Sequence, residues 1–210
     1  MSSVNIAMAA NSQRSRLRRP YHHGDLRNAL LAKAQTLLER DGPAVLSFRG
    51  IARAVGVSQT APYNHFPDKE HLLVALATIG LSELKARQIA AAAASQPEAR
   101  LEAIGRAYIH FARENPQMYR LMFGETISEW HRHPAAVAAK HDCFQPAREA
   151  WADELRSHQD TSPAEAETAA IAGWSVVHGL AMLMIDGVLQ EGSDDEALIT
   201  AVIRWHLRGL

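Results

Sequence analysis

The feature that most constrains this chain is a close succession of helix stops and helix starts in its first third. Asp41-Gly42-Pro43 ends a helical pattern, because glycine accepts the left-handed cap conformation and proline blocks continuation. Ser47 and Ser58 have the side chains of helix N-caps, Gly56 lies between them, and Pro67-Asp68 breaks the chain again. We therefore expect two short helices, the second running from Ser58 through Phe66, in a helix-turn-helix over residues 47–66.

Longer helices flank this motif on both sides. The preceding segment carries apolar residues at spacings of three, four and one, which predicts one buried helix face: Leu26, Ala29, Leu30, Ala34, Leu37 and Leu38. The following helix is expected to begin near Lys69 and to continue toward Ala94. A three-helix head of this kind would occupy residues 21–84, after a basic arm over residues 1–20.

The second half of the chain contains repeated helix-start patterns. Capping boxes are expected at residues 95–98, 162–165 and 193–196, and prolines open further helices. The predicted helices cover residues 97–114, 116–123, 134–157, 163–189 and 194–208. Because no strand pattern is convincing, we expect an all-α fold of about nine helices, with a helical body over residues 85–210.

Charge and composition narrow the functional classes. Residues 1–70 contain ten basic and five acidic residues, a net charge of +5, so the total of −1 leaves −6 for the remainder. A basic head on an acidic body suggests a polyanion partner, although chance clustering on a solvated surface is the alternative. The single cysteine, Cys143, fits a reducing cytoplasm. No secretory signal or uninterrupted apolar stretch of roughly 18 residues is found, so we expect a cytoplasmic protein without a membrane span.

The second short helix has side chains suited to reading DNA. Gln59 and Asn64 can pair with adenine edges, and Thr60 or Ala61 can meet a thymine methyl group. Residues near the helix starts are placed to contact phosphates. The expected DNA-binding set is Ser47, Arg49, Ser58, Gln59, Thr60, Ala61, Tyr63, Asn64, His65 and Lys69.

The segment from Ser47 to Glu70 resembles the signature of TetR-type transcription regulators. It contains an S-x-R-x-I-A element, a G-V-S turn, a Y-x-H-F element and a lysine, within a similarity covering roughly residues 24–84. The resemblance implies an all-helical homodimer in which Ser58 to Phe66 is the recognition helix. It also implies that Tyr63, His65 and Lys69 mostly contact phosphates, with Gln59, Thr60 and Ala61 nearer the bases.

The body is expected to hold an effector and to form the dimer. Trp174 to Gly179 resembles the W-x-x-x-H-G element of one TetR C-terminal subfamily. Candidate residues for an apolar effector pocket, each of which is more commonly plain core, are Tyr108, Phe111, Met118, Met122, Phe123, Trp151, Trp174, His178 and Met182. The last two helices have apolar residues over too much of their surface for one core face, so we expect them to pair as a four-helix bundle.

These patterns predict a non-enzymatic repressor that binds a near-palindromic operator as a dimer and is released by a small apolar or amphipathic effector, with no cofactor. A sequence-nonspecific DNA-binding protein is one alternative. A metal-binding enzyme is another, because a histidine-rich stretch contains His131, His133, His141, Asp142 and Cys143. No HExxH or paired CxxC motif supports the enzyme.

Overall fold

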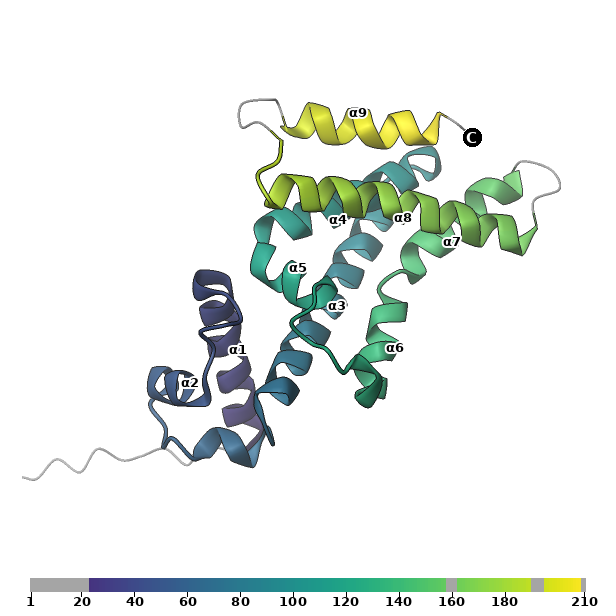
Figure 1. The fold of residues 1–210 in the computed structure, drawn as a ribbon. Helices are drawn as coiled ribbons and strands as arrows, with labels where there is room; N and C mark the ends of the chain where they lie inside the picture. Colours follow the sequence, from purple (N-terminus) through teal and green to yellow (C-terminus); the bar gives the residue numbers. More distant parts are fainter. Residues whose placement is uncertain (1–22, 158–161, 190–194, 209–210) are drawn as a thin grey trace, which may run out of the picture.

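A computed structural model describes residues 23–157, 162–189 and 195–208. These residues form nine α-helices and three short 3-10 segments, with an N-terminal head and a larger body joined by one long helix (Figure 1). The helices are α1 (His23–Asp41), α2 (Phe48–Val55), α3 (Lys69–Ala94), α4 (Arg100–Glu114), α5 (Pro116–Phe123), α6 (Pro134–Asp142), α7 (Gln145–Ser157), α8 (Pro163–Ile185) and α9 (Asp195–Leu207). The 3-10 segments are η1 (Ala61–Asn64), η2 (Pro97–Ala99) and η3 (Trp130–Arg132). The predicted all-α class is confirmed; the basic arm lies outside the described residues.

In the head, α1 ends, α2 begins and ends, and α3 begins at the predicted signals. Gly42 adopts a φ of 76°, and its N–H donates to the carbonyl oxygen of Leu38. Ser47 caps α2 by accepting a hydrogen bond from the backbone N–H of Gly50 at 3.1 Å. Gly56 ends α2 in the left-handed conformation, and Asp68 caps α3. The local chemistry of caps and glycines therefore sets the outline of the head.

The second helix of the motif is shorter than expected, and its predicted N-cap is wrong. Only the four residues of η1 are helical, and the Ser58 hydroxyl contacts the Thr60 hydroxyl instead of a backbone N–H. Pro62 explains the difference, because it has no N–H to donate to the carbonyl of Ser58 and disfavours α geometry in the residue before it. The chain instead forms tight turns, in which Ala61 N–H donates to the Ser58 carbonyl at 3.1 Å.

The long helix α3 joins head and body. Its first turns pack on α1, and its later turns pack on α4, α5, α6 and α7. Figure 1 shows α3 rising from the head into the centre of the body. The division we expected after residue 84 falls inside this helix. One continuous helix therefore contacts both regions.

Three predictions for the body need correction. The helix expected over residues 134–157 is broken between α6 and α7, because Pro146 cannot donate a backbone hydrogen bond four residues back. Ser95 does not open a capping box; its hydroxyl donates to the carbonyl of Ala92 and closes α3. Helix α8 ends at Ile185 because Gly187 turns the chain with a φ of 67°.

The other helix starts in the body agree with the sequence where they are described. Ser162 and Glu165 form the expected capping box at the start of α8. The box expected at residues 193–196 falls partly outside the described residues. Prolines stand at the starts of α5 and α6.

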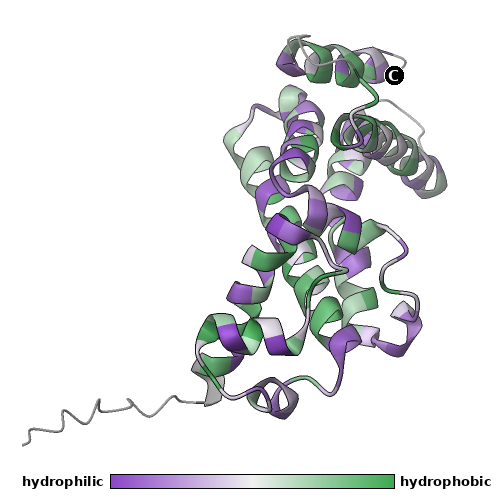
Figure 2. Cartoon of the chain, turned by 60° about the vertical axis from the view of Figure 1, so that its left-hand side comes forward, coloured by the Kyte–Doolittle hydropathy of each residue, from purple (hydrophilic) through white to green (hydrophobic). Residues whose placement is uncertain are grey.

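The core is one continuous cluster that extends from Leu30 in the head to Ile203 in α9. Helices α8 and α9 lie together at the far end of the body, and both contain many apolar residues (Figure 2). Ile171, Leu183 and Trp205 are 51%, 43% and 76% exposed. By length and composition α8 could also cross a membrane, a property it shares with helices of soluble proteins.

Candidate nucleic-acid interface and interior cavity

The proposed DNA-reading side chains form an exposed rim around η1. Gln59, Thr60, Tyr63 and Asn64 are exposed, and Tyr63 is 60% accessible despite its aromatic ring. Ser47, Arg49 and Ser58 are also exposed, whereas Ala61, His65 and Lys69 are half-buried. Pro62 faces inward and is buried. The ten predicted residues therefore lie at the start of α2, in and around η1, and at the start of α3.

Two contacts brace this rim against α2. The Arg49 guanidinium donates through Nε to the Gln59 side-chain oxygen at 3.2 Å, which ties the first helix of the motif to the reading segment. The Tyr63 ring meets the buried Phe48 ring edge-on, with centroids 4.8 Å apart. Because Phe48 is fixed in the core, it holds Tyr63 outward on a rigid base.

The start of α2 presents backbone N–H groups suited to an anion. Ser47 satisfies one of them, and its hydroxyl hydrogen remains available to a phosphate oxygen. The Lys69 ammonium group already has a partner within the head, because its Nζ donates to the carbonyl oxygen of Ala44 at 3.2 Å. In this structure Lys69 therefore links the start of α3 to the loop before α2.

The nine effector candidates separate into three groups. Tyr108, Trp151 and Trp174 line an interior cavity in the body. Phe111, Met118 and Met122 are at most 2% exposed and belong to the packed core. Phe123 and Met182 are partly buried against that core, and His178 lies in a polar network.

This network joins α4, α5 and α8. The Trp174 indole N–H donates to the Tyr108 hydroxyl at 3.1 Å, and the Tyr119 hydroxyl also donates to Tyr108, at 2.9 Å. Tyr108 in turn lies 3.0 Å from Nδ1 of His178. Burial lowers the pKa of His178, which favours the neutral ring that accepts the Tyr108 hydrogen. Burial likewise raises the pKa of both tyrosines, so they remain hydroxyl donors.

The cavity lies between α4, α7, α8 and α9, with Gln88 of α3 also in its wall. Its walls are mainly aliphatic and aromatic, and its free space is about 40 Å³. Gly173 allows α7 and α8 to approach, since a side-chain carbon there would lie 2.8 Å from the Trp151 indole nitrogen. The site is thus a small, mainly apolar space between the helices, close to the polar network.

The histidine-rich stretch does not assemble a metal site among the described residues, which contain no group of three or more suitable ligands. His131 and His141 are exposed, whereas Cys143 is buried. Burial raises the pKa of the Cys143 thiol to about 12. The thiol is therefore protonated at neutral pH and behaves as a small apolar side chain.

Sequence reasoning missed two polar residues of the cavity wall, Gln88 and His206. Both continue an apolar stripe at helical spacing, Gln88 after Leu84 and His206 after Ile203. A polar residue interrupting such a stripe was the available signal. Gln88 is only 2% exposed.

Comparisons with known proteins identify both halves of the chain. Residues 30–76 match the family model described as bacterial regulatory proteins of the tetR family. Residues 101–205 match the model described as the tetracyclin repressor-like C-terminal domain. The first match covers the exposed rim around η1, and the second covers most of the cavity wall.

Individual relatives agree with these matches. A protein of unknown function from Rhodococcus sp. RHA1 has a similar structure, with 35% identity, a TM-score of 0.79 and coverage of 91% of this chain and 98% of that one. The regulator FadR from Bacillus subtilis, solved with stearoyl-CoA, shares the fold at 12% identity and a TM-score of 0.70, covering 87% and 98% of the two chains. The nucleoid occlusion factor SlmA from Marinobacter nauticus is 28% identical over 102 residues, which are 48% of this chain and 52% of the relative. The matched region therefore spans about half the length of that curated relative.

Proposed function

The chain belongs to the TetR family of bacterial transcription regulators, and from this premise we propose that it is a dimeric repressor whose hold on a near-palindromic operator is released by a small molecule. The observation that carries this proposal is the exposed rim of polar side chains around η1, braced on α2. A protein that used this segment only for packing would bury it. We infer that it acts in the cytoplasm, where DNA is accessible, and that it is not an enzyme.

Within the rim we assign different roles to different residues. Gln59, Thr60 and Ala61 are assigned to base edges, because amide and methyl groups discriminate between bases in the major groove. Ser47, Tyr63 and Lys69 are assigned to phosphates, which position the head without reading sequence. Lys69 would exchange its carbonyl partner for a phosphate when DNA binds.

Footprinting of genomic fragments with the purified protein tests this proposal. We expect one protected near-palindrome, and Gln59→Ala should weaken binding to it by about tenfold, the value of a lost base-specific pair. Gln145→Ala, which changes an exposed glutamine in the body, is the matched control. Equal affinity for unrelated DNA would instead support a nonspecific DNA-binding protein.

We further propose that the outward faces of α8 and α9 form the dimer interface. Several exposed side chains there are small or apolar, as a four-helix bundle between two subunits requires: Ala172, Leu183, Ala197, Ala201 and Trp205. A two-fold dimer also explains how one small head can serve two half-sites. Trp205→Glu should convert the dimer to a monomer in sedimentation experiments, whereas Glu98→Gln, which changes an exposed glutamate in η2, should not.

The effector site is assigned to the interior cavity, whose walls include Tyr108, Trp151 and Trp174. The Bacillus subtilis relative was solved with stearoyl-CoA, which illustrates small-molecule binding in this fold. We infer the same general property for this chain, without transferring that ligand. A change in the cavity would reach the head through α3 and α5, both of which contact α1.

A further inference from the structure

The cavity wall contains no formal charge. Its residues are Gln88, Leu101, Ile104, Gly105, Tyr108, Phe144, Ala147, Trp151, Gly173, Trp174, Val176, Val177, Ile203, His206 and Leu207. Aspartate, glutamate, lysine and arginine are all missing from this set. A charged ligand would lose its hydration here without gaining an ionic partner, which is strongly unfavourable. The wall chemistry therefore selects neutral molecules.

Aromatic rings supply much of the wall. The Phe144 and Trp174 rings meet edge-on with centroids 4.4 Å apart, and the Trp151 ring meets His206 at 5.8 Å. Rings arranged in this way offer faces and edges to another ring. They suit a flat aromatic ligand better than a long flexible chain, which would also lose more conformational entropy on binding.

Two polar groups in this wall have unused hydrogen-bonding capacity. His206 Nε2 is fully buried and has no hydrogen-bond partner among the described residues. Gln88 Nε2 donates to the carbonyl oxygens of Cys143 and Leu84, at 3.0 and 3.4 Å, which fixes the amide orientation and leaves its oxygen as an acceptor. An unpaired buried nitrogen destabilises the empty protein, so a partner that satisfies it gains that energy on binding.

The cavity must open to admit a ligand. An apolar cavity of about 150 Å³ accommodates benzene, whereas the free space here is about 40 Å³. Helix α9 is the outermost wall (Figure 1), and Ile203, His206 and Leu207 form its inward face. Trp205 lies on the opposite face of the same helix and is exposed. A ligand under α9 would therefore press on the helix assigned to the dimer interface.

Resting on the proposed function, we propose that this cavity binds a small neutral aromatic molecule carrying a hydroxyl or N–H donor, and that His206 of α9 recognises the donor. In the tautomer that carries its proton on Nδ1, the His206 ring accepts the ligand hydrogen at Nε2, and the Gln88 side-chain oxygen offers a second acceptor in the same wall. The site thereby excludes carboxylates, phosphates and cations. Because His206 belongs to α9, a ligand bound in the cavity would contact that helix directly.

Calorimetric titration of the full chain with phenol, benzene and benzoate tests the ligand class. The three probes share one ring and differ only in being a neutral donor, a neutral molecule without a donor, and an anion. Phenol should bind about tenfold more tightly than benzene, the value of one hydrogen bond. Benzoate should bind more weakly than either. Equal binding of phenol and benzene, tighter binding of benzoate, or no binding of any probe would overturn the inference.

Variants of His206 test the recognition itself. His206→Phe should remove the tenfold preference for phenol while leaving the melting temperature of the empty protein unchanged or higher, because the unpaired nitrogen is gone. A residue with a merely structural role would lower that temperature. His206→Leu, which is smaller, repeats the test if the larger ring disturbs packing, and His131→Phe on the exposed surface is the control. A retained preference for phenol in both His206 variants would overturn the inference.

Operator binding by the head and ligand binding by the cavity can be measured separately. Footprinting without ligand should give the same operator protection for wild type and His206→Phe. A chain that binds phenol through His206 but protects no operator would contradict the proposed function and leave the cavity inference standing. Operator protection without any phenol preference would do the reverse.

Discussion

The head and the body hold their polar side chains in opposite ways. In the head, Gln59, Thr60 and Tyr63 point outward from a small packed base. In the body, Tyr108, Tyr119 and His178 satisfy one another between helices, beside an apolar cavity. The head is suited to a large charged partner that approaches from solvent, whereas the body is suited to a small neutral partner that must be enclosed.

The loss of a polar side chain should also affect the stability of the fold differently in the two regions. A polar side chain on the head can be lost with little effect on folding, since water replaces its partners. A polar side chain in the buried network around Tyr108 has no water to replace them, so its loss destabilises the fold. One continuous core nevertheless connects the two regions, and the following substitutions test how far the contrast extends.

The largest effect is expected from Leu38→Ala in the head. Leu38 is fully buried in the shared core, and truncation should lower the free energy of unfolding by about 2–5 kcal/mol. All four tryptophans lie in the body, so their fluorescence reports the body while circular dichroism reports every helix. Because the core is continuous, both signals should shift together to lower temperature. A shift in circular dichroism alone would show that the head unfolds separately, and Leu121→Ala in the body is the matched control.

A second test changes a tyrosine to phenylalanine once in the body and once in the head. Tyr108→Phe should cost about 1–3 kcal/mol of stability, because Trp174 loses its acceptor and the Tyr119 hydroxyl is left with one partner fewer. Tyr63→Phe should change stability by less than about 0.5 kcal/mol yet weaken operator binding by loss of a phosphate contact. Chemical denaturation and a binding titration on the same samples measure both effects. Similar stability losses for the two variants would contradict the contrast between the regions.

The same contrast explains what the sequence could predict. Caps at Ser47 and Ser162 and the turn at Gly42 depend on neighbouring residues, so their positions were predicted correctly. The motif signature also located the exposed rim, because its residues are consecutive. The shortening of the second helix to four residues was not predicted. It depends on Pro62, which has no backbone N–H and disfavours α geometry in Ala61.

The cavity could not be located in this way. Phe111, Met118 and Tyr108 are all apolar or aromatic residues at helical spacing, yet only Tyr108 lines the cavity. Which of them faces a void depends on how five helices pack, and local pattern does not contain that information. His206 and Gln88 come from helices more than one hundred residues apart, and only the tertiary structure brings them into one wall.

A smaller effect is expected at the junction between the regions. Glu39 of α1 accepts hydrogen bonds from the backbone N–H groups of Met118 and Gln117, at 2.8 and 3.3 Å, and so caps α5. Glu39→Ala should cost about 0.5–2 kcal/mol, the usual value of a lost cap. Glu39→Gln keeps an acceptor and should cost less.

The pKa of Glu39 predicts in which direction the stability difference between Glu39→Gln and wild type changes with pH. Burial raises the pKa of Glu39 above its ordinary value of 4.5, although the two N–H groups oppose the shift. The folded protein therefore takes up a proton at a higher pH than the unfolded chain does. The stabilisation that this proton uptake gives the folded protein is fully present below the ordinary pKa of Glu39. It is lost as the pH rises through the raised pKa. Relative to wild type, Glu39→Gln should thus lose stability as the pH falls through that window; a pH-independent difference would contradict the assignment.

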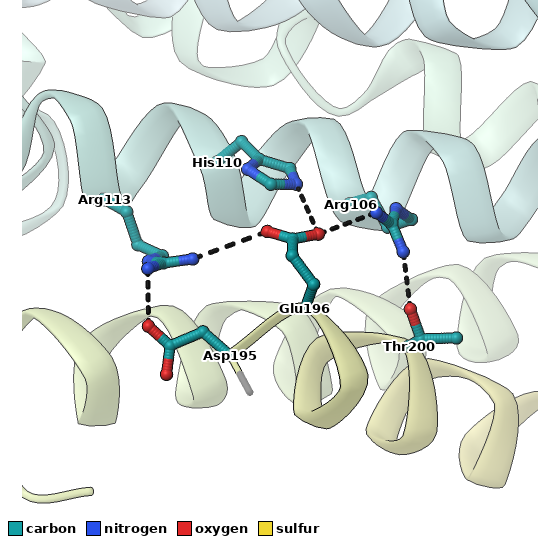
Figure 3. A network of polar contacts seen from close by, with 6 residues as sticks. All are labelled: Arg106, His110, Arg113, Asp195, Glu196 and Thr200. Atoms are coloured by element: carbon teal, nitrogen blue, oxygen red, sulfur yellow. Dashed lines mark hydrogen bonds and ion pairs between the residues drawn. The ribbon is translucent and has the colours of Figure 1, made fainter. Parts of the chain in front are cut away.

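A small effect on stability, and the sharpest test of the link between the cavity and α9, is expected at Glu196. Figure 3 shows the polar network between α4 and α9, in which Glu196 contacts Arg106 at 2.7 Å and Arg113 at 3.6 Å, while Asp195 contacts Arg113 at 2.6 Å. These side chains are partly exposed, so Glu196→Gln should cost only about 0.2–1 kcal/mol, and less at high salt. Glu98→Gln, an exposed glutamate just before α4, is the control.

The same substitution should act in the opposite direction on ligand binding. If α9 must move outward to admit a ring, a weaker tie to α4 lowers the free energy of opening, and the affinity for phenol should rise. Calorimetric titration of Glu196→Gln beside wild type measures this directly. An unchanged affinity together with reduced stability would show that α9 stays in place and that α7, which carries Trp151, is the wall that yields.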